Sequence, residues 1–388
     1  EAVSKMCFGN RVGMEFSGPL TAAELFAPAI GSLVLEVPES EDPATLFAGL
    51  PFRVLGRTLP EALIRVNGLE LELSALQRAW ESTLEDVFPT RVASRKNPMA
   101  PDPDYVRPFY GLRAGRTKSR HLARPRALVT VFPGTNNEYD VARAFSKAGA
   151  RAGTFVFCNR SAADIDESTA ELARRIRSSQ ILAIPGGFSA GDEPDGSGKF
   201  IAAVFRNPCL RDAVHELLEK RDGLVLGICN GFQALLKLGL VPYGEIRDLT
   251  PQSPTLTFNL IGRLVSRPVC TKVVSILSPW FGLCDAGAVH TIPVAHGEGR
   301  FVAPPATLEL LFSLGQVATQ YVDFAGRPTD DSFFNPNGSM MAIEGITSPD
   351  GRVLGKMGHS DRTGQYVLQN IPGDMDQKLF ASGVRYFQ

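Results

Sequence analysis

Short apolar runs alternate with amphipathic stretches from residue 127 onward. The apolar runs span residues 127–132, 154–157, 181–184 and 224–228. Helical spacing of apolar positions follows over residues 138–148, 167–178, 198–206, 210–221 and 230–240. Buried strands that alternate with helices predict an α/β fold with a doubly wound, mostly parallel sheet of the flavodoxin-like kind. In such a sheet, a ligand is expected beyond the carboxyl ends of the strands.

After residue 250 the pattern is more strand-like. The expected strands are 260–265, 272–276 and 289–295. These strands belong to the expected domain at 127–388, and the sequence contains no internal repeat.

The first segment, residues 1–90, has a different pattern. Strand-like pieces lie at 33–37 and 63–66, and a capping box formed by Ser74 and Gln77 predicts the start of a helix. The apolar stripe expected along that helix is Leu76, Trp80, Leu84 and Val87. This segment is too small and irregular for a complete catalytic domain. The chain opens on Glu-Ala-Val-Ser-Lys without an initiator Met, which suggests a fragment or a processed product.

Residues 91–126 form a basic, proline-containing connector. They contain ten Lys and Arg but only two acidic residues, Asp102 and Asp104. A nucleic-acid-binding arm is one interpretation, and a linker on an acidic neighbouring surface is the other. Few aromatic residues are available here for base stacking, which favours the linker. The expected organisation is therefore a small α+β segment at 1–90, a linker at 91–126 and a catalytic domain at 127–388.

Composition excludes several classes of protein. Of the 388 residues, 44% are hydrophobic and 21% charged, with a net charge of −1, which is typical of a globular protein without global attraction to nucleic acid or anionic membranes. The sequence has neither an apolar run of membrane-spanning length nor a secretory signal at its start. The six cysteines include no CxxC pair, so we expect no metal site, no disulfide framework and a cytoplasmic location.

The strongest chemical signal is the segment 227–233, Gly-Ile-Cys-Asn-Gly-Phe-Gln. A buried strand, a tight turn and a helix around G-x-C-x-G predict a nucleophile elbow with Cys229 in the nucleophile position. The helix N-terminus offers unpaired N–H groups and positive potential, which favour the thiolate form. The alternative is a buried structural cysteine at a Gly-rich turn.

A base and an acid for this nucleophile come late in the sequence. In an extended His-x-Asp segment, His359 and Asp361 point to the same side, so Asp361 can orient the imidazole. Cysteine, histidine and acid then form a triad by role. A surface histidine beside a carboxylate is the alternative.

Glycine-containing loops at the expected strand ends supply candidate binding groups. Gly186 and Gly187, followed by Phe188, can turn backbone N–H groups towards an oxyanion, with the N–H of Asn230 as a second donor. A plain Gly-Gly turn is the alternative. The segment 293–300 places His296 and Arg300 among glycines, where they line the site or belong to a polar turn.

Together these motifs resemble the triad-type glutamine amidotransferases. Three more selective segments resemble the glutaminase domain of the phosphoribosylformylglycinamidine synthase family: Gly-Thr-Asn-Asn-Glu at 134–138, Gly-Gly-Phe-Ser-Ala-Gly-Asp at 186–192 and Ala-His-Gly-Glu-Gly-Arg at 295–300. Residues 1–90 resemble the C-terminal end of the synthetase half, especially Arg-Val-Asn-Gly at 65–68.

The resemblance implies a reaction and its residues. Cys229 attacks the side-chain amide of glutamine, and His359, oriented by Asp361, moves the protons. Gly187 and Asn230 form the oxyanion hole, while Gln233 helps to bind glutamine. The ammonia passes to a synthetase portion that needs ATP and Mg, and no cofactor is expected in this chain. The family usually has Glu where this sequence has Asp361, which leaves one methylene less to reach the imidazole.

Two other functions stay open at this point. One is a different cysteine hydrolase, or a redox protein, on the same doubly wound sheet, with a reactive Cys229 that is indifferent to glutamine. The other is a non-catalytic fragment that docks a partner through its first segment and basic linker.

Overall fold

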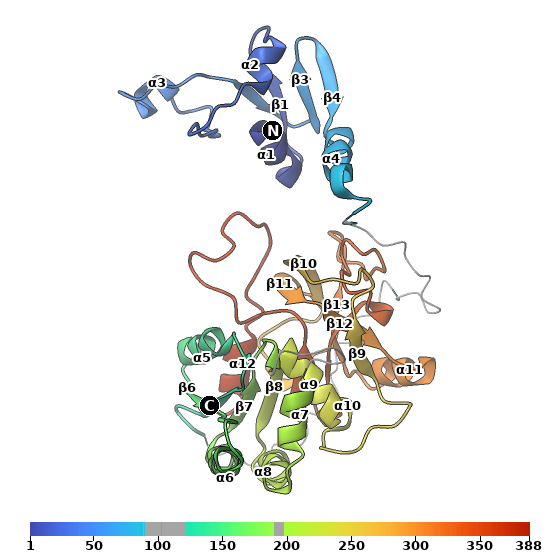
Figure 1. Cartoon of the computed structure of the whole chain (residues 1–388). Helices are drawn as coiled ribbons and strands as arrows, with labels where there is room; N and C mark the ends of the chain where they lie inside the picture. Colours follow the sequence, from blue (N-terminus) through green and yellow to red (C-terminus); the bar gives the residue numbers. More distant parts are fainter. Residues whose placement is uncertain (88, 90–101, 103–120, 190–197) are drawn as a thin grey trace. The chain divides into compact units, whose positions relative to one another are not determined.

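The computed structural model describes residues 1–87, 89, 102, 121–189 and 198–388. The chain divides into two compact units, residues 1–90 and 91–388 (Figure 1). Most of the expected linker at 91–126 lies outside the described residues. No helix in the described part is both long enough and apolar enough to cross a membrane.

The first unit has a four-stranded sheet in the order β2-β1-β3-β4. Its strands are β1 (Gly13–Phe16), β2 (Gly56–Leu59), β3 (Leu63–Val66) and β4 (Leu69–Glu72). The helices are α1 (Ala2–Asn10), α2 (Ala22–Phe26), α3 (Pro43–Leu46), α4 (Leu73–Glu81) and the 3₁₀ turn η1 (Ser82–Leu84). A small core of Cys7, Ile64 and Leu73 holds this unit together.

Several predictions for this unit need correction. The strand at 63–66 is confirmed, but residues 33–37 form no strand, because an apolar run becomes a strand only where a neighbour can pair with it. The capping box is wrong: α4 begins at Leu73 with Glu72 as its N-cap and without a side-chain cap. The predicted apolar stripe is largely exposed, with Trp80, for example, 51% accessible. Leu73 carries the packing instead.

The second unit is built on a nine-stranded sheet in the order β11-β10-β13-β14-β15-β8-β7-β5-β6. The parallel half consists of β5 (Arg126–Val131), β6 (Arg151–Val156), β7 (Ile181–Ile184), β8 (Leu224–Ile228) and β15 (Val353–Lys356). The antiparallel half consists of β10 (Val265–Val273), β11 (Val289–His296), β13 (Val317–Tyr321) and β14 (Ile343–Thr347). β9 (Thr255–Phe258) and β12 (Glu298–Val302) pair separately. The α/β fold class is confirmed, with a mixed sheet.

Helices cover this sheet. They are α5 (Glu138–Lys147), α6 (Ala162–Ser178), α7 (Lys199–Phe205), α8 (Pro208–Glu219), α9 (Asn230–Leu238), α10 (Leu240–Tyr243), α11 (Pro305–Ser313) and α12 (Leu379–Arg385), with 3₁₀ turns η3 (Pro279–Phe281) and η4 (Met340–Ala342). α5 contacts α12, whereas α6 contacts α8 and α7 contacts α9. The crossover through α5 runs from β5 out to β6, and the crossover through α6 runs from β6 back across the sheet to β7. Because parallel crossovers are right-handed, these opposite directions place α5 and α6 on opposite faces.

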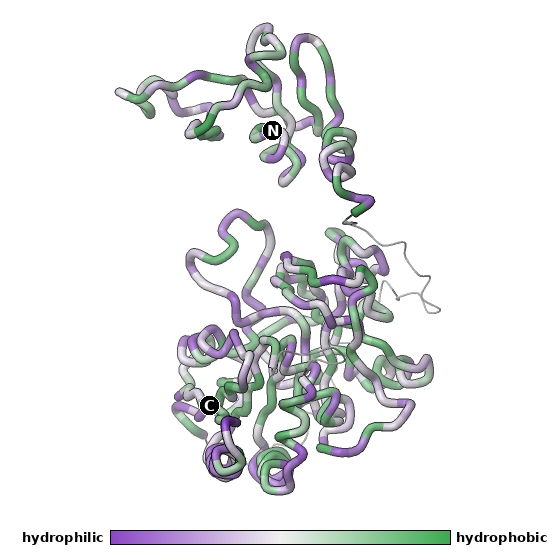
Figure 2. The backbone as a smooth tube through the Cα atoms, viewed as in Figure 1, coloured by the Kyte–Doolittle hydropathy of each residue, from purple (hydrophilic) through white to green (hydrophobic). Residues whose placement is uncertain are grey.

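The predicted helices from 138 onward are confirmed with shifted ends, and two strand predictions are corrected. α6 begins at Ala162 because the Ser161 side chain accepts a hydrogen bond from Asp164 N–H and caps it. Residues 260–263 form a turn rather than a strand, and β10 ends at Val273. Figure 2 shows apolar segments along the central strands and hydrophilic segments on the outer helix turns of this unit.

Candidate active site

Cys229 lies between the end of β8 and the start of α9. Its backbone has φ 52° and ψ −106°, a conformation that costs a residue with a side chain roughly 1–3 kcal/mol. Backbone hydrogen bonds on both sides stabilise the turn: Cys229 N–H donates to Lys356 O at 2.8 Å, and Cys229 O accepts from Gln233 N–H at 3.1 Å. These hydrogen bonds hold the strained backbone in place. The Cys229 side chain therefore lies at the carboxyl end of β8, as the sequence predicted for a nucleophile elbow.

Glycine at position 231 is required by close packing. A Cβ atom there would lie 1.9 Å from the carbonyl oxygen of Ile184, the last residue of β7. α9 can therefore start directly against the end of β7 only because residue 231 has no side chain. This packing determines where the elbow points.

Gly186 marks the point where the candidate residues meet. A Cβ atom on Gly186 would lie 2.7 Å from His359 Cε1, 3.0 Å from Asn137 Oδ1 and 3.4 Å from Cys229 Cβ. The loop around Gly186 is fixed against the neighbouring loop, because Phe188 N–H donates to Gly134 O at 2.8 Å. The fold thus brings Cys229 and His359 to one small space.

His359 and Asp361 form a buried pair. His359 Nδ1 lies 3.3 Å from Asp361 Oδ1, and both side chains are almost fully shielded from solvent. Neither ring nitrogen of His359 has an aligned hydrogen bond within the described residues, so the pairing is electrostatic here. Catalytic hydrogen bonds are often loose before substrate binds. Burial lowers the pKa of His359, but Asp361 and Cys229 raise it by more than burial lowers it, so the resulting pKa is about 9. The imidazole is therefore protonated at neutral pH.

Asn137 supports the acid from its other side. Asn137 Nδ2 donates to Asp361 Oδ2 at 3.2 Å, and Asn137 Oδ1 accepts from Arg362 Nη2 at 3.2 Å. Burial raises the pKa of Asp361, but His359 and Arg362 outweigh it and keep the carboxyl ionised. The sequence motif contained Asn137 but gave no indication of this contact, which depends on the fold.

Asn230 and Gln233 form a chain of side-chain hydrogen bonds on the first turn of α9. Asn230 Nδ2 donates to Gln233 Oε1 at 3.0 Å, and Gln233 Nε2 donates to Glu298 O at 2.5 Å. Asn230 Oδ1 accepts from Ser189 N–H at 3.4 Å, which connects α9 to the glycine loop. Phe188 in that loop is 44% exposed. The predicted binding residues thus lie on two adjoining elements.

His296 lies close to the candidate triad, whereas Arg300 contacts another loop. The backbone next to His296 borders the candidate nucleophile, since Cys229 Sγ lies 3.7 Å from Ala295 O. Burial and the charge of His359 lower the pKa of His296 to about 3, so its imidazole is neutral. His296 Nε2 is buried without a hydrogen-bond partner among the described residues. Arg300 Nε donates to Gly338 O at 3.3 Å.

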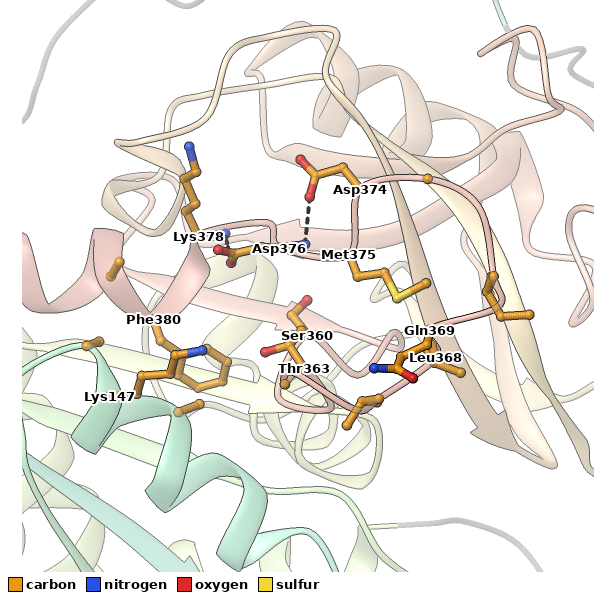
Figure 3. Close-up of a pocket in the computed structure, with 17 residues that line it drawn as sticks. Lys147, Ser360, Thr363, Leu368, Gln369, Asp374, Met375, Asp376, Lys378 and Phe380 are labelled. Atoms are coloured by element: carbon orange, nitrogen blue, oxygen red, sulfur yellow. Dashed lines mark hydrogen bonds between the residues drawn. The ribbon is translucent and has the colours of Figure 1, made fainter. Parts of the chain in front are cut away.

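A cavity of about 580 Å³ adjoins the segment after His359 (Figure 3). Ser360, Thr363, Lys147 and Phe380 contribute to its wall, whereas Cys229 does not. Its wall combines two lysines with two aspartates, so the side chains show no net preference for one charge. No group of three or more potential metal-ligating side chains occurs among the residues described.

Comparison with known proteins identifies the family to which most of this chain is similar. Residues 124–387 match the family model described as the CobB/CobQ-like glutamine amidotransferase domain. The chain is 37% identical over 247 residues to the phosphoribosylformylglycinamidine synthase subunit PurQ of Rhodospirillum rubrum, covering 63% of this chain and 93% of that protein. The PurQ subunit of Pyrococcus furiosus is 33% identical over 246 residues, covering 63% and 92%. A solved structure of PurLQS from Thermotoga maritima aligns at 26% identity with a TM-score of 0.49, covering 68% of this chain and all of that chain.

The resemblance inferred from the motifs is confirmed for this part of the sequence, while residues 1–90 lie outside the family match. The chain therefore belongs to the CobB/CobQ-like glutamine amidotransferase family and is a relative of the PurQ subunits of phosphoribosylformylglycinamidine synthase.

Proposed function

We propose that this chain hydrolyses glutamine and supplies the ammonia that converts formylglycinamide ribonucleotide to its amidine in purine biosynthesis. The observation that carries the proposal is the strained Cys229 beside His359, with Asp361 paired behind the histidine. The family match and the PurQ relatives support glutamine as the substrate class.

In the first step, the Cys229 thiolate attacks the side-chain amide carbon of glutamine. The carbonyl oxygen becomes an oxyanion, which the backbone N–H groups of Gly187 and Asn230 stabilise. His359 then gives its proton to the amide nitrogen. The carbon–nitrogen bond breaks, ammonia leaves and a γ-glutamyl thioester remains on Cys229.

In the second step, water attacks the thioester. His359, neutral after the first step, accepts a proton from the water, which forms a bond to the same carbon. The carbon–sulfur bond breaks, glutamate leaves, and Cys229 returns to the thiolate beside a protonated His359. Asp361 stays ionised throughout and orients the imidazole.

Glutamine binding falls to residues around the elbow. Gln233 is buried and already linked to Glu298 O, so it fixes the wall of the substrate site next to Cys229. The neutral His296 offers an unprotonated nitrogen to a donor on the substrate, because Asn259 Oδ1 lies 3.3 Å from its other ring nitrogen. Arg300 contributes indirectly, through the Gly338 loop.

A synthetase portion uses the ammonia. We assign residues 1–90 to that portion on the strength of their sequence resemblance, and we expect ATP and Mg to bind in the rest of it. The linker at 91–126 would connect the two activities in one polypeptide.

The proposal is tested by measuring glutamate release from glutamine with the synthetase partner and its substrates present. Cys229→Ala should abolish release, and His359→Ala should lower kcat by at least about 10²-fold, within the range for acid–base catalysis. Cys158→Ala is the matched control, since Cys158 is a free cysteine that takes no part in the proposed chemistry. Undiminished hydrolysis by Cys229→Ala would refute the proposal.

A further inference from the structure

A buried ion pair lies directly behind the candidate triad. Lys356 is the last residue of β15, Glu344 belongs to the adjacent β14, and Lys356 Nζ lies 3.3 Å from Glu344 Oε1. Both side chains have 0% exposure. The pair therefore belongs to the centre of the sheet, where charges are rare unless paired.

The pair makes hydrogen bonds to both residues that flank His359. Lys356 Nζ donates to Gly358 O at 2.9 Å and to Ser360 Oγ at 3.0 Å. Glu344 Oε1 accepts from Gly358 N–H at 2.6 Å. The Thr319 hydroxyl donates to the other oxygen of Glu344. The main chain is thereby fixed immediately before His359, and the side chain immediately after it is anchored too.

Lys356 also contacts the nucleophile turn. Its carbonyl oxygen accepts the hydrogen bond from Cys229 N–H at 2.8 Å, so one residue contacts the turn that carries the thiol and the loop that carries the imidazole. His359 N–H donates to Pro293 O at 2.8 Å, which adds a support from β11.

Stability alone does not explain this arrangement. Burying two ions costs several kcal/mol each, and apolar residues of similar volume often stabilise a protein equally well or better. The loop is also in close contact with the pair, since a Cβ atom on Gly358 would lie 2.9 Å from Glu344 Oε1 and 3.1 Å from Lys356 Nζ. A charged pair with these contacts fixes the loop in one position.

The network continues beyond the loop. Ser360 Oγ donates to Gln377 Oε1 at 2.6 Å, and Gln377 Nε2 donates to Thr271 Oγ1 on β10 at 3.1 Å. Ser360 lies on the cavity wall in Figure 3. The contacts of Lys356 therefore connect the histidine loop to the antiparallel half of the sheet.

We propose that the Lys356–Glu344 ion pair positions His359 against Cys229, and that this positioning supplies part of the glutaminase rate. The inference rests on the proposed function. Lys356 and Glu344 are positioning residues that act through His359, and neither contacts the reacting atoms. A misplacement of about 1 Å can cost about 10²-fold in rate, so losing these contacts has a measurable effect.

The test is the rate at which a glutamine-mimicking diazo ketone labels Cys229 in the full chain, measured by intact mass. Lys356→Met should lower the maximal labelling rate about 10- to 10²-fold, while the concentration for half-maximal rate changes less than about twofold. Ser360→Ala, which removes only one of the hydrogen bonds of Lys356 Nζ, should slow labelling less. Because Lys356→Met leaves Glu344 unpaired, the neutral double variant K356M/E344Q covers the case in which the single variant fails to fold.

Val353→Ala is the matched control, because Val353 is a buried residue at the opposite end of the same strand from Lys356, and its side chain carries neither a charge nor a hydrogen-bonding group. It should lower the melting temperature without slowing the labelling. A second readout is the pH dependence of labelling by the diazo ketone, which should shift towards that of His359→Ala in Lys356→Met but not in Val353→Ala.

The outcomes separate the inference from the proposed function. If His359→Ala slows labelling but the folded Lys356 and Ser360 variants label at the wild-type rate, the positioning role is refuted and the glutaminase stands. If the variants slow only as much as Val353→Ala does for the same loss of stability, the pair is structural and the inference fails. If the wild-type chain is not labelled at Cys229, both fail.

Discussion

At the scale of single residues, the charge state of His359 is the feature with the greatest chemical consequence. Its pKa is raised to about 9 because Asp361 and Cys229 outweigh the effect of burial. With a pKa of about 9, against about 6.5 for an ordinary histidine, the imidazole keeps its proton at neutral pH and loses it as the pH rises through 9. At neutral pH, His359 thus holds the proton that the proposed release of ammonia requires.

This charge state predicts a pH dependence. Labelling of wild-type Cys229 by a glutamine-mimicking diazo ketone should slow as the pH rises through about 9, whereas His359→Ala should label about tenfold more slowly at pH 7 and show no such decline. The thioester-forming step should slow above about pH 9, since the acid form of His359 disappears there. Intact mass against time at several pH values measures the labelling. Superimposable pH profiles for the two proteins would contradict the charge state assigned to His359.

Asn137 supports the short acid of the candidate triad. Asn137 Nδ2 donates to Asp361 Oδ2, so the carboxylate is supported on the side away from His359. Asn137→Ala should lower kcat for glutamine about tenfold with little change in KM, because the contact orients the acid and does not bind substrate. Asn136→Ala is the control, since Asn136 is exposed. Equal kinetics for the two variants would exclude this role.

At the scale of elements, the strand–turn–helix around Cys229 was predictable because its signals are local. The buried strand has an unbroken apolar run, and the glycines mark the turn. The errors have tertiary causes. Residues 33–37 have no strand to pair with, and 260–263 turn between β9 and β10 although they are apolar enough for a strand. Contacts such as Asn137 to Asp361 join residues far apart in sequence, and no local pattern encodes them.

The packing of α9 on β7 gives a prediction for the element. Gly231→Ala should lower the free energy of unfolding by at least about 1–3 kcal/mol and slow the labelling of Cys229, since the new methyl group would overlap the Ile184 carbonyl. Gly153→Ala in β6 is the control, because a Cβ atom there meets nothing within 4 Å. Chemical denaturation measures the free energy of unfolding of both variants, and intact mass measures their labelling. A Gly231 variant as stable as the Gly153 variant would disprove the packing argument.

At the scale of the whole molecule, the two units have separate cores. The core of the second unit draws only on residues from Ala127 to Phe387, whereas the first unit depends on Cys7, Ile64 and Leu73. Composition and pattern predicted a change of structure near residue 126, and the family match begins at residue 124. The relation of residues 1–90 to a synthetase stays a prediction from resemblance.

Separate cores predict that residues 121–388 fold alone. The shortened chain should keep the melting transition of the second unit and the labelling rate of Cys229 by the glutamine mimic. Residue 121 is the starting point because Leu122 N–H donates to Phe387 O at 2.9 Å. Calorimetry and intact mass provide the measurements. Aggregation of the shortened chain, or a Cys229 that no longer reacts, would show that the second unit depends on the first.

The central claim is that Cys229 is the nucleophile of a glutamine site formed within this chain. The most direct measurement is intact mass after incubation of the full chain with a glutamine-mimicking diazo ketone, with and without excess glutamine, followed by mapping of the adduct. We expect one adduct, on Cys229, that glutamine suppresses and His359→Ala slows. An adduct on another cysteine, or labelling of Cys229 that glutamine leaves unchanged, would contradict the account.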